Sequence, residues 1–344
     1  MTRSRRIEML ELKPFLVDVP VKVNIWIRYE CLREQFEVLK KARPSILFIQ
    51  SDGGRSEKEW DAINKGRAMF DNEIDWDCTV YKLYEETNQG LYAMSKKVAA
   101  FLWEKVDRCI LLEDDIIPSV SFFRYCAELL EKYKDDQRIE CVCGMNHLGV
   151  YEDVNADYFF SRQGSIWGVA TWRRVVMERG DFSYGQDEYV MKNLKKHTKK
   201  NKMAWNRIDA YSKQEYYEGH VAGGEFWYEF NMYAQNRLQI IPKYNMISNI
   251  GAGKDSAHMD ELKKFPRGFR RVFNMKTYEI EFPLNHAKYV FNDEKYEKKR
   301  NRIMAYNAPW TKFVRRIERF FILLRYGDLF KVIKKKFKKR KIEK

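Results

Sequence analysis

The chain contains no hydrophobic run long enough to cross a membrane as a helix. A spanning helix needs about 20 apolar residues, and the apolar stretch 320–324 is far shorter. Residues 1–20 include basic side chains but lack the apolar core of a secretory signal, so we expect no signal peptide. No internal repeat is visible. We therefore expect a cytoplasmic protein whose contact with a membrane, if it has one, is peripheral and on the inner face.

Cysteine is scarce and follows no metal-binding or disulfide pattern. The 6 cysteines lack the paired spacing of a zinc site. Cys141 and Cys143 would face the same side of a strand, and several of the others lie in apolar runs. We interpret them as small core residues of a protein in a reducing compartment.

Positive charge is concentrated at the C-terminal end. The formal net charge is +15, and residues 311–344 hold 14 Lys and Arg against 3 Asp and Glu. Apolar residues in this tail follow a helical stripe: 313, 314, 317, 320, 321 and 324. This pattern predicts a basic amphipathic helix on an anionic membrane surface. A helix docked on the rest of the chain is the alternative, and nucleic-acid binding is the least favoured reading.

Strand-like and helix-like segments alternate between residues 21 and 145. Strands are expected at 21–28, 46–50, 77–84, 108–112 and 139–145, with helices at 30–42, 56–70, 91–105 and 119–133. This alternation predicts an α/β fold of Rossmann-like type, with a mostly parallel central sheet and helices on both faces. Ligands of such sheets bind beyond the carboxyl ends of the strands.

Polar groups follow three of these strands where each one ends. The apolar run 109–112 leads directly into three carboxylates, Glu113–Asp115. Adjacent anions repel one another unless a positive charge lies among them. Mg²⁺ or Mn²⁺ needs one or two carboxylates when the phosphates of a nucleotide supply other ligands. Arg28 and Asp52 end the first two strands, so one edge of the sheet should collect all of these groups.

The second half is less regular. Residues 161–172 combine small residues with two tryptophans, and residues 181–215 are basic and polar, which predicts an exposed insertion. A helix at 225–236, a strand at 238–242 and a Gly-rich loop at 248–258 follow. We divide the chain into an extension, a nucleotide-binding half, an acceptor-binding half and a tail: 1–20, 21–146, 147–310 and 311–344.

With these pieces in this order, the chain resembles the GT-A-fold glycosyltransferases, especially bacterial enzymes related to animal N-acetylglucosaminyltransferase I. The resemblance covers residues 20–260. Its most specific part is Glu113-Asp114-Asp115 followed by Pro118 and Phe122-Phe123. The other matches are Ile27-Arg28, Ser51-Asp52-Gly53, the run 85–90, Trp167–Trp172 and the loop 249–258.

The resemblance implies a donor site around the three carboxylates. Asp115 would hold Mn²⁺ or Mg²⁺ against the diphosphate of a nucleotide-sugar, and His258 would reach the diphosphate or metal side. Asp114 would accept hydrogen bonds from the ribose, and Glu113 would face the donor sugar.

The resemblance also implies roles for residues on other strands. Asp52 would read the nucleobase, uracil in the relatives, and Arg28 would lie beside the nucleotide. Trp167 would form a wall of the sugar or acceptor site. Asn88 stands before Gly90 and is either a ligand contact or a left-handed turn residue.

A carboxylate base is needed to take the proton of the acceptor hydroxyl. The relatives carry it on the helix start matched here by 225–229, but with Asp beside the Trp. Glu229 is our first candidate and Glu225 the second. A single base predicts inversion at the anomeric carbon.

We therefore predict an inverting, metal-dependent glycosyltransferase of the hexosyl or N-acetylhexosaminyl type. Its donor would be a UDP-sugar, and its acceptor a hydroxyl of a bacterial capsule, O-antigen or exopolysaccharide, with a polyprenyl-lipid-linked acceptor as one option. A sugar nucleotidyltransferase is an alternative, but 28–31 is not the Gly-rich phosphate loop that such enzymes carry. A non-catalytic protein that binds nucleotide-sugars or glycans is the other.

Overall fold

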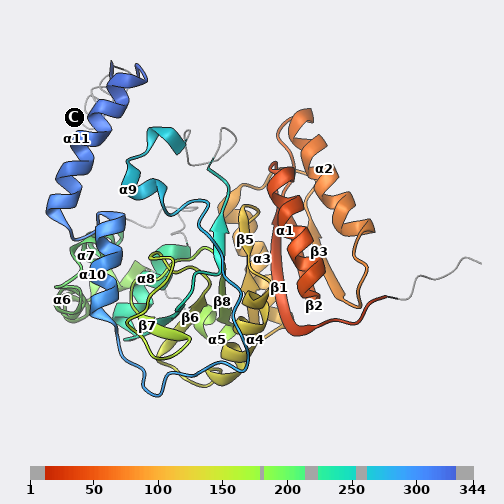
Figure 1. The fold of residues 1–344 in the computed structure, drawn as a ribbon, viewed down its shortest axis with the longest axis horizontal. Helices are drawn as coiled ribbons and strands as arrows, with labels where there is room; N and C mark the ends of the chain where they lie inside the picture. The colour runs from red at the N-terminus through yellow and green to blue at the C-terminus, as the bar shows by residue number, and fades with distance from the viewer. Residues whose placement is uncertain (1–11, 179–181, 214–223, 253–261, 331–344) are drawn as a thin grey trace, which may run out of the picture.

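One large sheet with helices on both faces organises the protein (Figure 1). The computed structural model describes residues 12–178, 182–213, 224–252 and 262–330. The strands of the sheet are β1 (Val17–Ile25), β2 (Pro44–Ser51), β3 (Thr79–Tyr84), β4 (Arg108–Leu111), β6 (Ile139–Cys143), β7 (Tyr158–Ser161), β8 (Val169–Trp172) and β9 (Leu238–Pro242). They lie in the order β3-β2-β1-β4-β8-β6-β9-β7. The expected α/β fold is confirmed.

The half of the sheet formed by β3-β2-β1-β4 is entirely parallel, as the alternation predicts. Alternate residues of these strands face opposite sides, and each side buries its apolar members under a helix. Leu32 and Phe36 pack on the side that holds Val21, and Trp103 packs on the side that holds Phe48. The helices between the strands are α1 (Tyr29–Ala42), α2 (Glu57–Asn72) and α3 (Leu91–Lys105).

The other half of the sheet is mixed, because β8 enters between β4 and β6 and runs antiparallel to both. β6 and β9 are parallel, and β7 pairs antiparallel with β9 at the edge. All four residues of β8 are buried. The segment, which lacks strand-like alternation in the sequence, is therefore a central strand and not a loop. Two helices flank this half: α4 (Ser121–Lys132) and α5 (Arg173–Met177).

A second, two-stranded sheet joins distant parts of the chain beside the acidic residues. It pairs β5 (Ile116–Pro118) with β10 (Ile247–Asn249) in antiparallel register, with Asn249 opposite Ile116. The pairing brings the start of the Gly-rich loop to the end of β4.

Residues 181–215, predicted as an exposed insertion, include three helical segments that pack on a fourth. These are η1 (Phe182–Gln186), α6 (Glu188–His197), α7 (Lys202–Ser212) and α8 (Gly224–Ala234). Tyr184, Leu194, Ile208 and Phe230 form part of a small aromatic core separate from the main one. The lysines of α6 are exposed, so the basic residues lie outside a packed helical layer.

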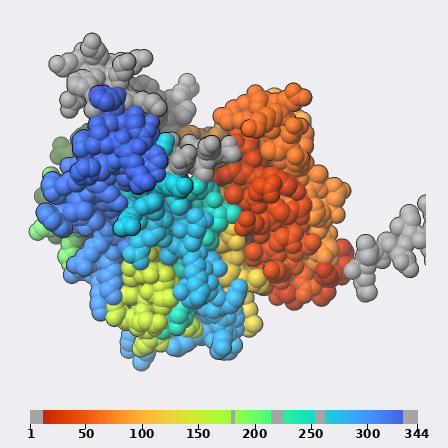
Figure 2. All heavy atoms as spheres, turned by 45° about the horizontal axis from the view of Figure 1, so that its top comes forward, coloured from red at the N-terminus to blue at the C-terminus, as the bar shows by residue number. Residues whose placement is uncertain are grey.

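The C-terminal part wraps back over this layer. It contains η2 (Leu262–Lys264), α9 (Arg267–Arg270), α10 (Glu294–Met304) and α11 (Pro309–Arg325). α11 lies at the end of the molecule opposite α2 (Figure 1), and in the space-filling view it borders the segment with η2 and α9 (Figure 2). None of its residues is buried. In the part of the chain that the structure describes, no helix is both long and apolar enough to span a bilayer.

Candidate functional site

The three carboxylates lie at the edge of the sheet where β4 ends. Asp114 and Asp115 are buried and Glu113 is exposed. The parallel register brings the ends of β1 and β2 to the same edge, so Arg28 and the acidic residues meet there as expected.

Arg28 pairs directly with both buried carboxylates. Its Nε donates to Asp114 Oδ2 at 3.0 Å, and its Nη2 donates to the other oxygen of Asp114. Its Nη1 donates to Asp115 Oδ2 at 2.8 Å. The two carboxylates and the guanidinium therefore form one ion-pair cluster, in which the positive charge of Arg28 offsets the repulsion between the adjacent carboxylates.

The start of the Gly-rich loop closes over this cluster. Ile250 N donates to Asp115 O at 3.0 Å, and Gly251 N donates to Asn249 Oδ1 at 3.0 Å. A Cβ on Gly251 would lie 2.0 Å from Asp115 Oδ2 and 2.5 Å from Arg28 Nη1. Only glycine fits at this position, because any side chain would displace the ion pair.

Asp115 retains one oxygen that suits a divalent cation. Its Oδ1 is buried and has no hydrogen-bond partner among the described residues, and burial raises the pKa of this carboxyl. Across those residues no three His, Cys, Asp or Glu side chains are grouped to hold a metal, and His258 lies outside them. The arrangement fits Mg²⁺ or Mn²⁺ bound by one carboxylate and completed by phosphates and water.

Lys22 is a neighbour of this edge that sequence reasoning missed. Burial lowers its pKa to about 8, and the nearby Glu113 carboxylate acts in the opposite direction. Lys22 and Asn24 alternate with the buried valines of β1. This polar pair on one face of an otherwise apolar strand is the sequence pattern that could have identified Lys22.

Asp52 and Asn88 meet at the end of β2, where they shape a loop. Asp52 Oδ1 accepts hydrogen bonds from Gly53 N and Gln89 N, both at 2.8 Å. Its Oδ2 accepts from Gly90 N at 3.0 Å and from Asn88 Nδ2 at 3.2 Å. A carboxylate has about four acceptor positions, so Asp52 would exchange one of these bonds to contact a nucleobase. That contact stays a prediction.

Trp167 lines a cavity in the second half of the chain. Its ring packs on Phe273 with centroids 5.2 Å apart. Gly168 follows with φ +60°, and a Cβ there would meet Ile116, the residue after Asp115, at 3.3 Å. The segment that carries Trp167 therefore packs beside the residue that follows the acidic edge.

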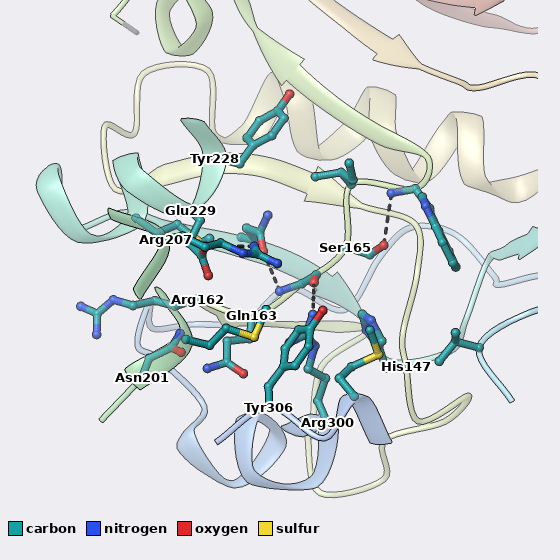
Figure 3. Close-up of a pocket in the computed structure, with 18 of the residues that line it drawn as sticks. His147, Arg162, Gln163, Ser165, Asn201, Arg207, Tyr228, Glu229, Arg300 and Tyr306 are labelled. Carbon is teal, nitrogen blue, oxygen red and sulfur yellow. Dashed lines mark hydrogen bonds and ion pairs between the residues drawn. The ribbon is translucent and has the colours of Figure 1, made fainter. Parts of the chain in front are cut away.

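The cavity has a volume of about 290 Å³ and contains Glu229 (Figure 3). Arg207 Nη1 donates to Glu229 Oε2 at 3.0 Å, so α7 fixes the orientation of a carboxylate that α8 supplies. Arg300 rises from the opposite wall toward Gly164, beside Tyr306 and His147 (Figure 3). This volume matches the small end of ligand pockets.

Several buried polar atoms in the cavity wall have no partner within the described residues. They are His147 Nδ1, Gln163 Oε1, Arg162 Nε and Arg300 Nε. His147 is 3% exposed and Gln163 is 7% exposed, and burial, aided by Arg300, lowers the pKa of His147 well below its usual value. Unpaired buried polar groups are costly, so their grouping here suits a polar ligand or ordered water.

Sequence reasoning did not identify the cavity, because its polar wall comes from six separate segments. The second candidate base, Glu225, lies in the first turn of α8, and its side chain is outside the described residues.

No family model and no curated protein match the chain. Among solved structures, a mannosyltransferase from Pyrobaculum calidifontis in complex with GDP-Man and Mn²⁺ is similar at 12% identity and a TM-score of 0.34, over 57% of this chain and 56% of that one. The match thus spans little more than half of the mannosyltransferase. A 4-diphosphocytidyl-2C-methyl-D-erythritol synthase from Anaerococcus prevotii is similar at 10% identity and a TM-score of 0.34, over 68% of this chain and 91% of that one. Mouse xyloside xylosyltransferase 1 is similar at 11% identity and a TM-score of 0.33, over 63% of this chain and 82% of that one.

Proposed function

We propose that the protein is a metal-dependent, inverting glycosyltransferase that moves a sugar from a nucleotide-diphosphate donor, a UDP-sugar, to a hydroxyl of a bacterial surface glycan. One observation carries this proposal. Asp115 presents an unpartnered buried oxygen at the sheet edge. Gly168, the residue after the cavity-lining Trp167, packs beside Ile116, the residue after Asp115, and the cavity holds an oriented carboxylate.

The donor binds at the acidic edge. Asp115 Oδ1 would hold the divalent cation, with His258 as the second candidate ligand, and a cation bound there would supply positive charge for the leaving diphosphate. Asp114 fixes Arg28 by two hydrogen bonds, and this guanidinium places a second positive charge beside the same phosphates. The loop that Asp52 shapes lies against the nucleoside.

The acceptor binds in the cavity next to Glu229. Its hydroxyl oxygen attacks the anomeric carbon and forms the new glycosidic bond, while the bond from that carbon to the diphosphate breaks and the diphosphate takes the electron pair. Glu229 accepts the hydroxyl proton, and Arg207 keeps the carboxylate aimed at the acceptor. Trp167 would form part of the wall of the acceptor site.

Incubation with a panel of UDP-, GDP- and TDP-sugars and Mn²⁺ tests this proposal. We expect slow metal-dependent release of the nucleoside diphosphate from one donor, faster release with the correct acceptor, and an inverted linkage by NMR. Pyrophosphate release from a nucleoside triphosphate and a sugar phosphate would indicate a nucleotidyltransferase instead. Nucleotide binding without turnover of any donor would indicate a binding protein.

We further propose that α11 holds the enzyme on the inner face of the cell membrane. Trp310 is 75% exposed and Phe321 is 62% exposed, and arginines flank this apolar stripe. An anionic leaflet complements both features, because the side chains enter the lipid interface and each nearby cation adds about 1 kcal/mol.

Sedimentation with liposomes of phosphatidylglycerol and phosphatidylcholine measures this attachment. We expect the variant with Trp310→Asp and Phe321→Asp to lose most of its binding to the anionic liposomes and to keep its metal-dependent nucleotide binding. Equal sedimentation of the variant and the wild type would refute a membrane role for α11.

A further inference from the structure

A second, larger groove runs along α11 and is strongly basic. Its volume is about 1040 Å³, and the described residues that line it include eight Lys and Arg and one acid, Asp328. Lys264 pairs with Asp328 at 3.1 Å and Lys200 pairs with Glu294 at 2.8 Å. Lys312, Arg316 and Arg319 have no ion-pair partner among the described residues.

α11 divides its surface between this groove and solvent. Lys312, Arg316, Arg319 and Leu323 recur at helical spacing and line the groove. Phe313, Ile317, Phe320 and Leu324 form the neighbouring stripe, which is exposed or only half-buried. One helix thus presents a cationic stripe and an apolar stripe side by side.

The groove continues toward the cavity that contains Glu229. Met203, Phe269, Met304 and Tyr306 line both spaces. The cavity and the groove therefore adjoin at these four side chains, and the apolar stripe of α11 lies next to the groove.

We propose that this groove binds a phosphate or diphosphate group of the acceptor, which links the acceptor sugar to a long-chain alcohol held in the membrane. The inference rests on the proposed function, because it assigns the adjoining cavity to the acceptor sugar. Unpaired Lys and Arg side chains supply the charge-assisted hydrogen bonds that phosphate oxygens accept. The apolar stripe accounts for the hydrocarbon chain, which a free sugar phosphate lacks.

Calorimetric titration of the full chain with geranyl diphosphate tests the assignment. EDTA is present so that the acidic edge cannot bind the probe through a metal. We expect the variant with Arg316→Glu and Arg319→Glu to bind at least about tenfold more weakly, and added salt to weaken binding to the wild type. The matched control is Lys58→Glu with Lys65→Glu, which makes the same charge change on two exposed lysines of α2 and should bind like the wild type.

The choice of probe separates the sources of the phosphate group. Binding of geranyl diphosphate at least about tenfold tighter than inorganic pyrophosphate supports a lipid carrier, and equal affinities would overturn it. Equal binding by the groove variant and the control would overturn the phosphate site itself. A short RNA that binds tighter than geranyl diphosphate and is lost in the groove variant would assign the groove to nucleic acid.

The same variants separate this inference from the proposed function. The groove variant should keep Mn²⁺-dependent thermal stabilisation by UDP, because the acidic edge is unchanged. If the groove variant loses geranyl diphosphate binding but the wild type binds no nucleotide, the phosphate site in the groove is supported and the glycosyltransferase proposal is refuted. Normal turnover of a UDP-sugar with unchanged probe binding in the groove variant would refute the groove alone.

Discussion

Replacing Asp114 and Asp115 one at a time by asparagine should separate two roles that adjacent carboxylates share. Asp114 receives two hydrogen bonds from Arg28, whereas Asp115 receives one and keeps a second oxygen unpartnered. Asparagine has nearly the same shape as aspartate but is neutral and has one acceptor oxygen. The two variants therefore remove different parts of the cluster.

The hydrogen bonds set the expected size of each effect on stability. A hydrogen bond to a charged group contributes about 1.5–3 kcal/mol. Asp114→Asn keeps one acceptor oxygen and loses the other bond, so it should lower the free energy of unfolding by about 1.5–3 kcal/mol. Asp115→Asn keeps an amide oxygen for Arg28 Nη1, so its cost should be about 1 kcal/mol. Urea denaturation of the two variants and the wild type measures both values.

Nucleotide binding should show the opposite order of importance. With Mn²⁺ present, we expect Asp115→Asn to weaken UDP binding at least about tenfold, which corresponds to about 1.4 kcal/mol, because its neutral oxygen is a poorer ligand for a hard cation. Binding without Mn²⁺ should change little. Calorimetry with and without Mn²⁺ provides the test. Unchanged Mn²⁺-dependent binding in Asp115→Asn would refute the metal assignment, and a stability loss equal to that of Asp114→Asn would make Asp115 a structural residue.

Three further predictions concern the loop, the base and the support of α8. Gly251→Ala should weaken Mn²⁺-dependent UDP binding in calorimetry, because its Cβ would collide with the ion pair; wild-type affinity would contradict this packing. Glu229→Gln should lower kcat about 10²–10⁴-fold in the donor assay with little change in UDP affinity, and an undiminished kcat would remove Glu229 as the base. Glu140→Ala should destabilise the protein by about 3–5 kcal/mol in urea, because it leaves the buried Arg237 without its 3.2 Å partner and Asn231 of α8 without its acceptor. Arg237 also pairs with Glu178, and a loss below about 1 kcal/mol would show that this second pair suffices.

Local patterns predicted the first half of the fold well, because each element there follows a simple period. The five strands expected between residues 21 and 145 and the four helices between them all form, with ends shifted by a few residues. Because β1, β2 and β4 run parallel, their carboxyl ends lie at one edge of the sheet, and Arg28, Asp52 and the carboxylates follow them there. β8 was not predicted, because four buried residues of mixed type show no period that distinguishes a strand from a loop.

Local patterns were enough to predict an α/β sheet, an acidic strand end that needs a cation, and an amphipathic basic tail, since these depend on neighbours within a few positions of one another. The packing of distant segments decided that Arg28 is the cation that meets Asp114 and Asp115, and that Asp52 accepts its hydrogen bonds from a loop. It also decided that Glu229, Arg207 and Arg300 share one cavity. Such contacts join residues dozens of positions apart. They depend on which helices and strands pack together, and the local periodicity of a sequence does not contain that information.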